Sequence, residues 1–188
     1  MLEQYYVYDS TYDLTGQIFG WFAFAAAFIR FQMKTTIQIR FMNIVSCTLF
    51  AIHYSFLLEW AGAIMFMIAG FRSILLMFAR FWQYKNTIAI GAVILSAMTL
   101  FFTFSQWYHL MPLIAIFLGA LMDIQPKAVF ARLFGGLMHI FWLIYAISTG
   151  SQGGTLNSGI VIFSNLSGFW RHHLYPYIKT KDKTHFDM

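Results

Sequence analysis

The chain has little charge, one cysteine and three prolines. Only 10% of its 188 residues are Asp, Glu, Lys or Arg, whereas a soluble domain carries about 25%. Hydrophobic residues make up 60% of the chain, and its mean hydropathy is +0.65. A chain of this length with so few charges does not cover a water-facing surface, so its surroundings are predicted to be the lipid bilayer.

The single cysteine, Cys47, excludes an intrachain disulfide framework and a metal site built from several cysteines. It lies in the middle of a segment among Val45, Thr48 and Leu49, which indicates an inert buried thiol. The net charge of +5 is not arranged as a nucleic-acid footprint, because no basic run is interleaved with polar residues, and no nucleic acid is expected as a partner. The first residues include Glu3, Asp9 and Asp13 but no basic run, so no cleaved signal peptide is expected.

Sequence motifs for catalysis are missing as well. The chain has no Gly-rich phosphate loop, no Gly-x-Ser-x-Gly, no His-Glu-x-x-His and no paired carboxylates. Asp123 is the only acidic residue within an apolar segment, and its place beside Lys127 favours a topogenic salt bridge or a solvated end over a proton relay. We therefore expect no enzyme activity, no cofactor and no metal site.

Seven continuously apolar segments are long enough to cross the hydrocarbon layer of ~30 Å, which takes about 20 helical residues. They cover residues 14–31, 36–57, 60–80, 86–104, 107–124, 128–148 and 155–171. Helices are predicted rather than barrel strands, because the runs lack a two-residue alternation. The predicted fold class is an all-α integral membrane protein. Pro112 lies inside the fifth segment and predicts either a kink or the true start of that helix.

Basic residues alternate between the joints of these segments. Lys and Arg flank the first, third and fifth joints and follow the last segment, whereas the N-terminal arm and the other three joints have none. The positive-inside rule therefore predicts an N-terminus outside and a C-terminus in the cytoplasm of a bacterial inner membrane. Trp60 and Trp107 then fall at outer ends, and Trp82 and Trp170 at inner ends, as in an aromatic belt.

Polar positions recur at a spacing of 92 or 93 residues. Gln32 and Gln125 are 93 residues apart, whereas Arg40 and Arg132 are 92 apart. This spacing predicts two parallel three-helix repeats joined by a linking helix, a 3+1+3 plan. The predicted units are an extracytoplasmic arm at 1–13, a first repeat at 14–80, a linking helix at 86–104, a second repeat at 107–171 and a basic cytoplasmic tail at 172–188.

The pattern of polar and small residues along the chain resembles that of one bacterial family. They are Gln-x-Lys after the first segment, a His on the second, Gly-Ala in the third, Gly-Gly-Thr after the sixth, and Asn165 ahead of Phe-Trp-Arg171. Over residues 14–173 they resemble the YgjV-type family of inner-membrane proteins, which itself implies no substrate. The 3+1+3 plan is similar to the SWEET and PQ-loop group, which implies transport of sugars, vitamins, amino acids or other small solutes. The Pro-Gln order that names the PQ-loop group is absent, because Gln125-Pro126 is its reverse.

Polar residues at membrane depth are the candidate site residues, because a polar group left unpaired in hydrocarbon costs several kcal/mol. Arg72 lies about twelve residues into the third segment, or ~18 Å down. It either snorkels to the cytoplasmic side or binds an anionic substrate group bidentately. Asn165 overlays Ser73 at the 92-residue shift. The SWEET resemblance implies that both face a central pathway, whereas helix–helix hydrogen bonding is the alternative.

His139 and Trp142 share one face of the sixth segment. A proton-coupled step at His139 or at His53 is one hypothesis, and a structural hydrogen bond is the other. Trp142 either forms an aromatic wall for a bound ring or sugar or fills the bundle. Gly16-x-x-x-Gly20 has the spacing of close helix packing and leaves a homo-oligomer open.

The sequence therefore predicts a small-solute membrane carrier. Its candidate substrate-binding residues are Arg72, Ser73, His139, Trp142 and Asn165. The alternative is a non-transporting membrane subunit or sensor that binds a partner protein through the helix bundle, and it predicts a closed core without a cavity.

Overall fold

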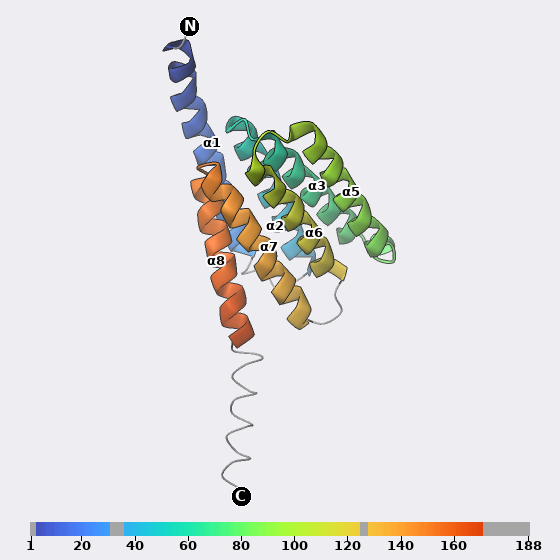
Figure 1. Ribbon diagram of the computed structural model, residues 1–188. Coiled ribbons are helices and arrows are strands. Elements are labelled where there is room, and N and C mark those ends of the chain that lie inside the picture. Colours follow the sequence, from blue (N-terminus) through green and yellow to red (C-terminus); the bar gives the residue numbers. More distant parts are fainter. Residues whose placement is uncertain (1–2, 31–35, 125–127, 171–188) are drawn as a thin grey trace, which may run out of the picture.

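A computed structural model describes residues 3–30, 36–124 and 128–170, and within these ranges all regular secondary structure is helical (Figure 1). The predicted all-α class is thereby confirmed. The helices are α1 (Glu3–Arg30), α2 (Thr36–Phe56), α3 (Trp60–Met77), α4 (Ala79–Trp82), α5 (Lys85–Thr103), the 3-10 turn η1 (Trp107–His109), α6 (Leu110–Ile124), α7 (Ala128–Ser148) and α8 (Gln152–Phe169).

The seven long helices lie at the seven apolar segments, and the differences at their ends have local causes. α1 begins at Glu3, because no Gly or Pro interrupts the chain between that residue and the apolar segment. The third segment breaks after Met77, where Phe78 has extended backbone angles. α8 begins before residue 155 because Ser151 caps it, accepting a hydrogen bond from the backbone N–H of Gly154.

Pro112 marks the start of a helix and does not kink one. It lies in the first turn of α6, directly after η1. The N–H groups of a first turn have no partner within the helix, so the missing N–H of proline costs nothing there. Of the two sequence-based alternatives for this proline, the helix start is therefore confirmed.

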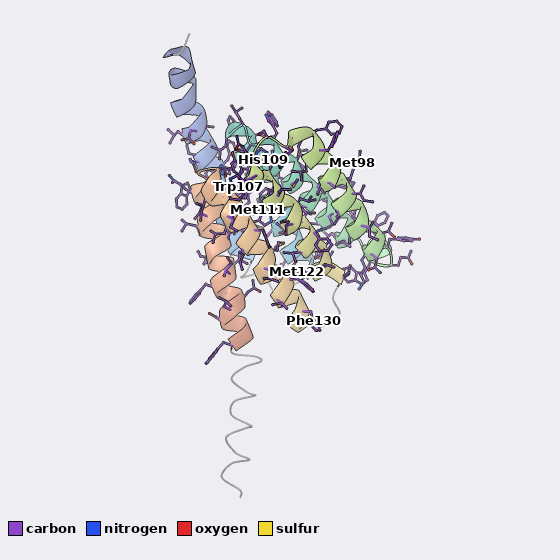
Figure 2. The ribbon with its side chains drawn as sticks, viewed as in Figure 1. Met98, Trp107, His109, Met111, Met122 and Phe130 are labelled. Carbon is purple, nitrogen blue, oxygen red and sulfur yellow. The ribbon has the colours of Figure 1, made fainter. Side chains whose placement is uncertain are left out.

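Among the described residues, three helices are long and apolar enough to cross a membrane by length and composition, at Trp60–Met77, Phe81–Thr103 and Trp107–Ile124. Shorter apolar helices cover Asp13–Ile29 and Leu133–Ser148. Large apolar side chains point away from the bundle, among them Met98 on α5 (Figure 2), and Phe101 is 82% exposed. Such a surface suits a lipid environment, while the full set of seven spans stays a prediction.

Six helices form a ring, and α5 lies outside it. α1 packs on α2, α2 on α3, α3 on α6, α6 on α7, α7 on α8, and α8 on α1. α5 packs against α3 and α6 (Figure 1). We call the end of the ring at which α3 begins the Glu59 end, and the opposite end, at which α6 ends, the Asp123 end.

Candidate functional site

A cavity of about 440 Å³ lies inside the ring. All six ring helices supply residues of its lining, and α5 supplies none of the described ones. A volume of this size is typical of a small-molecule site. The polar residues of the lining are Arg40, Asn43, Ser46, Arg72, Ser73, Asp123, His139, Asn157, Ser158 and Asn165.

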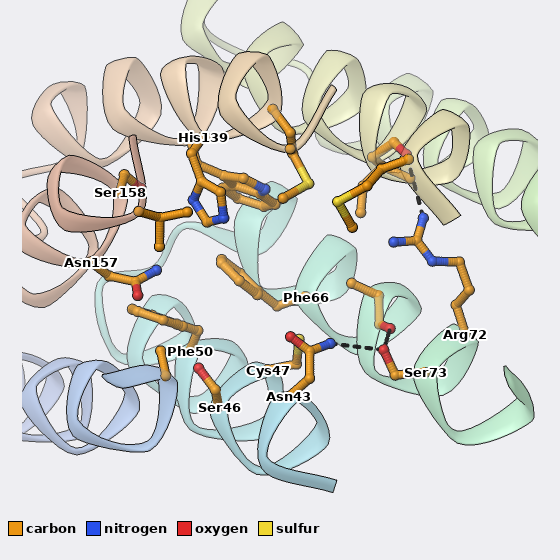
Figure 3. Close-up of a pocket in the computed structure, with 18 of the residues that line it drawn as sticks. Asn43, Ser46, Cys47, Phe50, Phe66, Arg72, Ser73, His139, Asn157 and Ser158 are labelled. Atoms are coloured by element: carbon orange, nitrogen blue, oxygen red, sulfur yellow. Dashed lines mark hydrogen bonds between the residues drawn. The ribbon is translucent and has the colours of Figure 1, made fainter. Parts of the chain in front are cut away.

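The structure brings all five sequence-predicted site residues to this cavity. Ser73 accepts a hydrogen bond of 2.8 Å from the side-chain amide of Asn43 and donates one of 3.0 Å to the carbonyl of Ala69 (Figure 3). Asn165 donates to the carbonyl of Val161 at 2.9 Å. Ser73 thus has a hydrogen bond to a neighbouring helix, the bond of Asn165 lies within its own helix, and both residues line the cavity. Their binding of a solute stays a prediction.

Stacked aromatic rings form one wall of the cavity. The ring centroids of Phe66 and Trp142 lie 4.2 Å apart, and those of Phe50 and Phe66 lie 4.9 Å apart. Tyr54 stacks on Phe66 at 5.6 Å. Trp142 therefore both fills the bundle and lines the cavity, and its use as a wall for a bound ring or sugar stays a prediction. Phe66 was missed from sequence, because an aromatic residue in an apolar helix carries no local sign of its direction.

Arg72 forms a buried ion pair. Its Nε atom lies 3.1 Å from Oδ2 of Asp123, and the two side chains are 9% and 25% exposed. Its Nη1 group donates a long hydrogen bond of 3.5 Å to the carbonyl of Ile116 (Figure 3). A salt bridge is thus present at Asp123, with Arg72 as its described partner, whereas both alternatives for Arg72, snorkelling and binding of an anionic group, stay predictions. The pairing predicted with Lys127 lies outside the described residues.

Gly119 allows α6 to approach this arginine. A Cβ atom at Gly119 would lie 3.1 Å from Nη2 of Arg72 and 2.9 Å from the sulfur of Met138. Both distances are too short for ordinary contact, so any larger residue displaces the guanidinium or the thioether. The place of Arg72 in the cavity therefore depends on a glycine across from it.

Two sets of hydrogen bonds fasten the Glu59 end. The Nδ1 atom of His53 lies 2.6 Å from the carbonyl oxygen of Gly16, and its Nε2 atom lies 2.6 Å from Oγ of Ser151. A carbonyl only accepts, so Nδ1 carries the proton and the Ser151 hydroxyl donates to Nε2. His53 is 0% exposed and is absent from the cavity lining. The structure therefore shows His53 in a structural role, as a hydrogen-bonded link between helices.

Glu59 is the centre of the second set. Its Oε2 atom accepts from Nε2 of His109 at 3.0 Å and from the hydroxyl of Tyr145 at 3.2 Å, and its Oε1 atom accepts from Tyr108 at 3.2 Å. The Tyr145 hydroxyl in turn accepts from the backbone N–H of Gly62 at 2.9 Å. The sequence does not indicate this role, because Glu59 stands between two apolar segments and its partners are 49 to 86 residues away.

The Gly16-x-x-x-Gly20 pattern packs within the chain. A Cβ atom at Gly16 would lie 3.1 Å from Cβ of Phe56, and one at Gly20 would lie 3.0 Å from the ring of His53. Both glycines thus let α1 approach α2. The spacing therefore has an intramolecular use, and a homo-oligomer stays a prediction.

Comparisons with known proteins give one match. A protein-family model, Imp-YgjV, described as bacterial inner membrane protein, matches residues 14–175. None of the curated proteins and none of the solved structures compared matches the chain. The described part of the chain holds no group of three or more His, Cys, Asp or Glu placed to bind a metal. The likeness to the SWEET and PQ-loop group gains no support from these comparisons.

Proposed function

The chain belongs to the Imp-YgjV family of bacterial inner membrane proteins, and on that premise we propose that it is a carrier of small solutes. The observation that carries the proposal is the cavity of about 440 Å³ with its ten polar lining residues. Polar side chains are costly at membrane depth and are kept mainly where they face a pathway or one another. A subunit that only holds a partner protein is expected to have a closed core instead.

The order of helix contacts supports a carrier built from two repeats. α1 contacts α2, and α2 contacts α3; in the same way, α6 contacts α7, and α7 contacts α8. The contact between α3 and α6 corresponds to the contact between α8 and α1. We call α1–α3 the first triplet and α6–α8 the second triplet. This order is the one expected of two parallel units with α5 as the link, the 3+1+3 plan.

The difference between the two ends of the ring supports alternating access. At the Glu59 end the lining residues Tyr54 and Gly154 are buried, and hydrogen bonds join the triplets. At the Asp123 end the lining residues Arg40, Asp123 and Asn165 are only half-buried. Under the predicted topology, the cavity faces the cytoplasm in this conformation. Rocking of the triplets then opens the Glu59 end and closes the other.

A ligand screen followed by exchange in vesicles tests the proposal. The purified protein in detergent is screened for thermal stabilisation by sugars, nucleosides, vitamins, amino acids and organic anions. A ligand at 100 times its dissociation constant stabilises the fold by about 2.7 kcal/mol. Each hit is then radiolabelled and its counterflow is measured in proteoliposomes. We expect saturable exchange that is lost in Asn165→Ala and kept in Ser167→Ala, because Ser167 lies exposed on the same helix.

Two results would overturn the proposal or its site. Silence across the panel, together with a partner protein that co-purifies in fixed ratio, favours the non-transporting subunit. Wild-type exchange in the double variant Arg72→Ala and Asn165→Ala would show that the cavity is not part of the transport pathway, because both residues line it.

A further inference from the structure

We infer that the solute is a small organic monoanion with a flat ring, bound with its anionic group at Arg72 and its ring against the stacked aromatic side chains. The inference rests on the proposed carrier function and names the substrate class of the same cavity. Three features carry it: the charge of the lining, the direction of the Arg72 guanidinium, and the aromatic wall.

The lining carries a net positive charge. Its charged residues are Arg40, Arg72 and Asp123, which sum to +1, and the rest of the described lining is neutral when His139 is neutral. Arginine stays ionised in proteins, so the two positive charges of the lining persist. A charge in a low-dielectric site interacts strongly with an opposite one, because solvent screens it weakly. A monoanion therefore neutralises the lining, whereas a neutral sugar leaves it uncompensated.

The guanidinium of Arg72 has donors to spare. It offers five N–H groups, of which Nε faces Asp123 and Nη1 makes one long hydrogen bond to the carbonyl of Ile116. The other terminal nitrogen, Nη2, points into the cavity (Figure 3). A carboxylate or a phosphate is the acceptor that matches the planar fork of arginine. Asp123 holds the fork in place and leaves this side of it for a ligand.

The aromatic wall extends from this cation toward the Glu59 end. Phe50, Phe66 and Trp142 all line the cavity, and their rings stack pairwise at 4.9 Å and 4.2 Å. Flat rings bind to such a surface by offset stacking. The amides of Asn43 and Asn157 lie along the same cavity and suit polar substituents on a ring. One end of the site thus selects charge and the adjoining wall selects a flat apolar body.

Binding of four matched probes tests the inference. The protein in nanodiscs of neutral phosphatidylcholine is titrated with benzoate, benzamide, cyclohexanecarboxylate and glucose in a calorimeter. Benzoate is expected to bind at least tenfold more tightly than benzamide, which has the same ring without the charge. Cyclohexanecarboxylate, which has the charge without the flat ring, is expected to bind more weakly than benzoate. Glucose is expected not to bind.

Variants assign these differences to residues. Arg72→Gln is expected to weaken benzoate binding at least tenfold and to remove the preference over benzamide. Lys85→Gln is the matched charge control, because Lys85 is bonded to the carbonyl of Ile124 and does not line the cavity. Trp142→Leu is expected to weaken benzoate binding, whereas Trp21→Leu, at a side chain 44% exposed outside the lining, leaves it unchanged.

Arg40→Gln keeps the test decisive if the Arg72 variant does not fold. It lowers the charge of the lining to zero and leaves the ion pair of Arg72 with Asp123 intact, so benzoate affinity is expected to fall at least threefold. Equal binding of benzoate and benzamide, or unchanged benzoate affinity in a folded arginine variant, overturns the inference. Exchange of a neutral solute without benzoate binding overturns it and leaves the carrier standing. Benzoate binding without benzoate exchange supports the inferred ligand class and overturns the carrier function.

Discussion

The Nε2 atom of His53, on α2, lies 2.6 Å from the Oγ atom of Ser151, the residue before α8. The repeat predicted from the 92-residue spacing pairs this contact with a second one. Adding 92 to 53 gives Tyr145, and adding 92 to 59 gives Ser151. Tyr145 on α7 donates to Glu59, the residue before α3. The middle helix of each triplet therefore reaches to the start of the last helix in the other triplet, and these crossed contacts lie at the same end of the ring.

The first prediction concerns Ser151. Its hydroxyl donates to His53 and accepts from the backbone N–H of Gly154, so Ser151→Ala removes a helix cap and a contact between triplets together. We expect the free energy of unfolding to fall by about 1–3 kcal/mol, the range for a lost cap and a buried unsatisfied group. Thermal melting in detergent measures this as a lower Tm.

The matched control for that variant is Ser55→Ala. The Ser55 hydroxyl donates only to the carbonyl of Ala51 in its own helix, and the side chain is half-buried near the same end. Its loss is expected to change Tm little. Equal destabilisation by the two substitutions would show that the contact between triplets contributes nothing.

The second prediction concerns the closest approach of α1 and α8. A Cβ atom at Gly153 would overlap the backbone of Gly20, which has no side chain to move aside. Gly153→Ala is therefore expected to separate these helices and to destabilise the fold by about 1–3 kcal/mol or more, the cost of overpacking. Gly159→Ala is the control on the same helix, because no atom lies within 4 Å of a Cβ placed there. A wild-type Tm for Gly153→Ala would contradict the packing of α1 on α8.

The sequence predicted the positions of the helices better than it predicted which face of each helix points inward. Hydropathy placed seven helices, and Pro112 limited its own position to a kink or a helix start, because both depend on residues near in the chain. Polarity at depth found Arg72 and Asn165, since a polar side chain in an apolar helix is conspicuous. Phe66 was missed because a helix that is apolar all round carries no stripe to indicate its inner face. The roles of Glu59 arise from contacts between triplets, which no local pattern encodes.

The third prediction concerns the ion pair of Arg72 and Asp123. Arg72→Gln and Asp123→Asn each leave one charge without its partner in a site where the side chains are 9% and 25% exposed. We expect each to cost about 2 kcal/mol, less than the ~3–5 kcal/mol of a fully buried pair, because Asp123 keeps some solvent. The double variant is expected to cost less than the sum of the two, since no lone charge remains. Additive losses in this double-mutant cycle would show that the two side chains do not interact.

The fourth prediction concerns topology. Ser105, between α5 and η1, and Gln83, between α4 and α5, are exposed and lie in joints that the charge pattern places on opposite sides of the membrane. In a Cys47→Ala background, Ser105→Cys is expected to react with a membrane-impermeant maleimide in intact spheroplasts. Gln83→Cys is expected to react only after the membrane is permeabilised, which is also the control that its thiol is reactive.

The same labelling decides which way the cavity faces. The Glu59 end is fastened by His53 and Tyr145. Ser105 lies at the same end, because it follows Thr103 by two residues and the carbonyl of Thr103 contacts His109. If Ser105→Cys is the outer site, the fastened end is outside and the half-buried Asp123 end opens to the cytoplasm. The reverse labelling pattern would place Arg40 and Asp123 at an outer opening. An anion would then meet the arginines from outside, and the carrier would be in its outward-facing conformation.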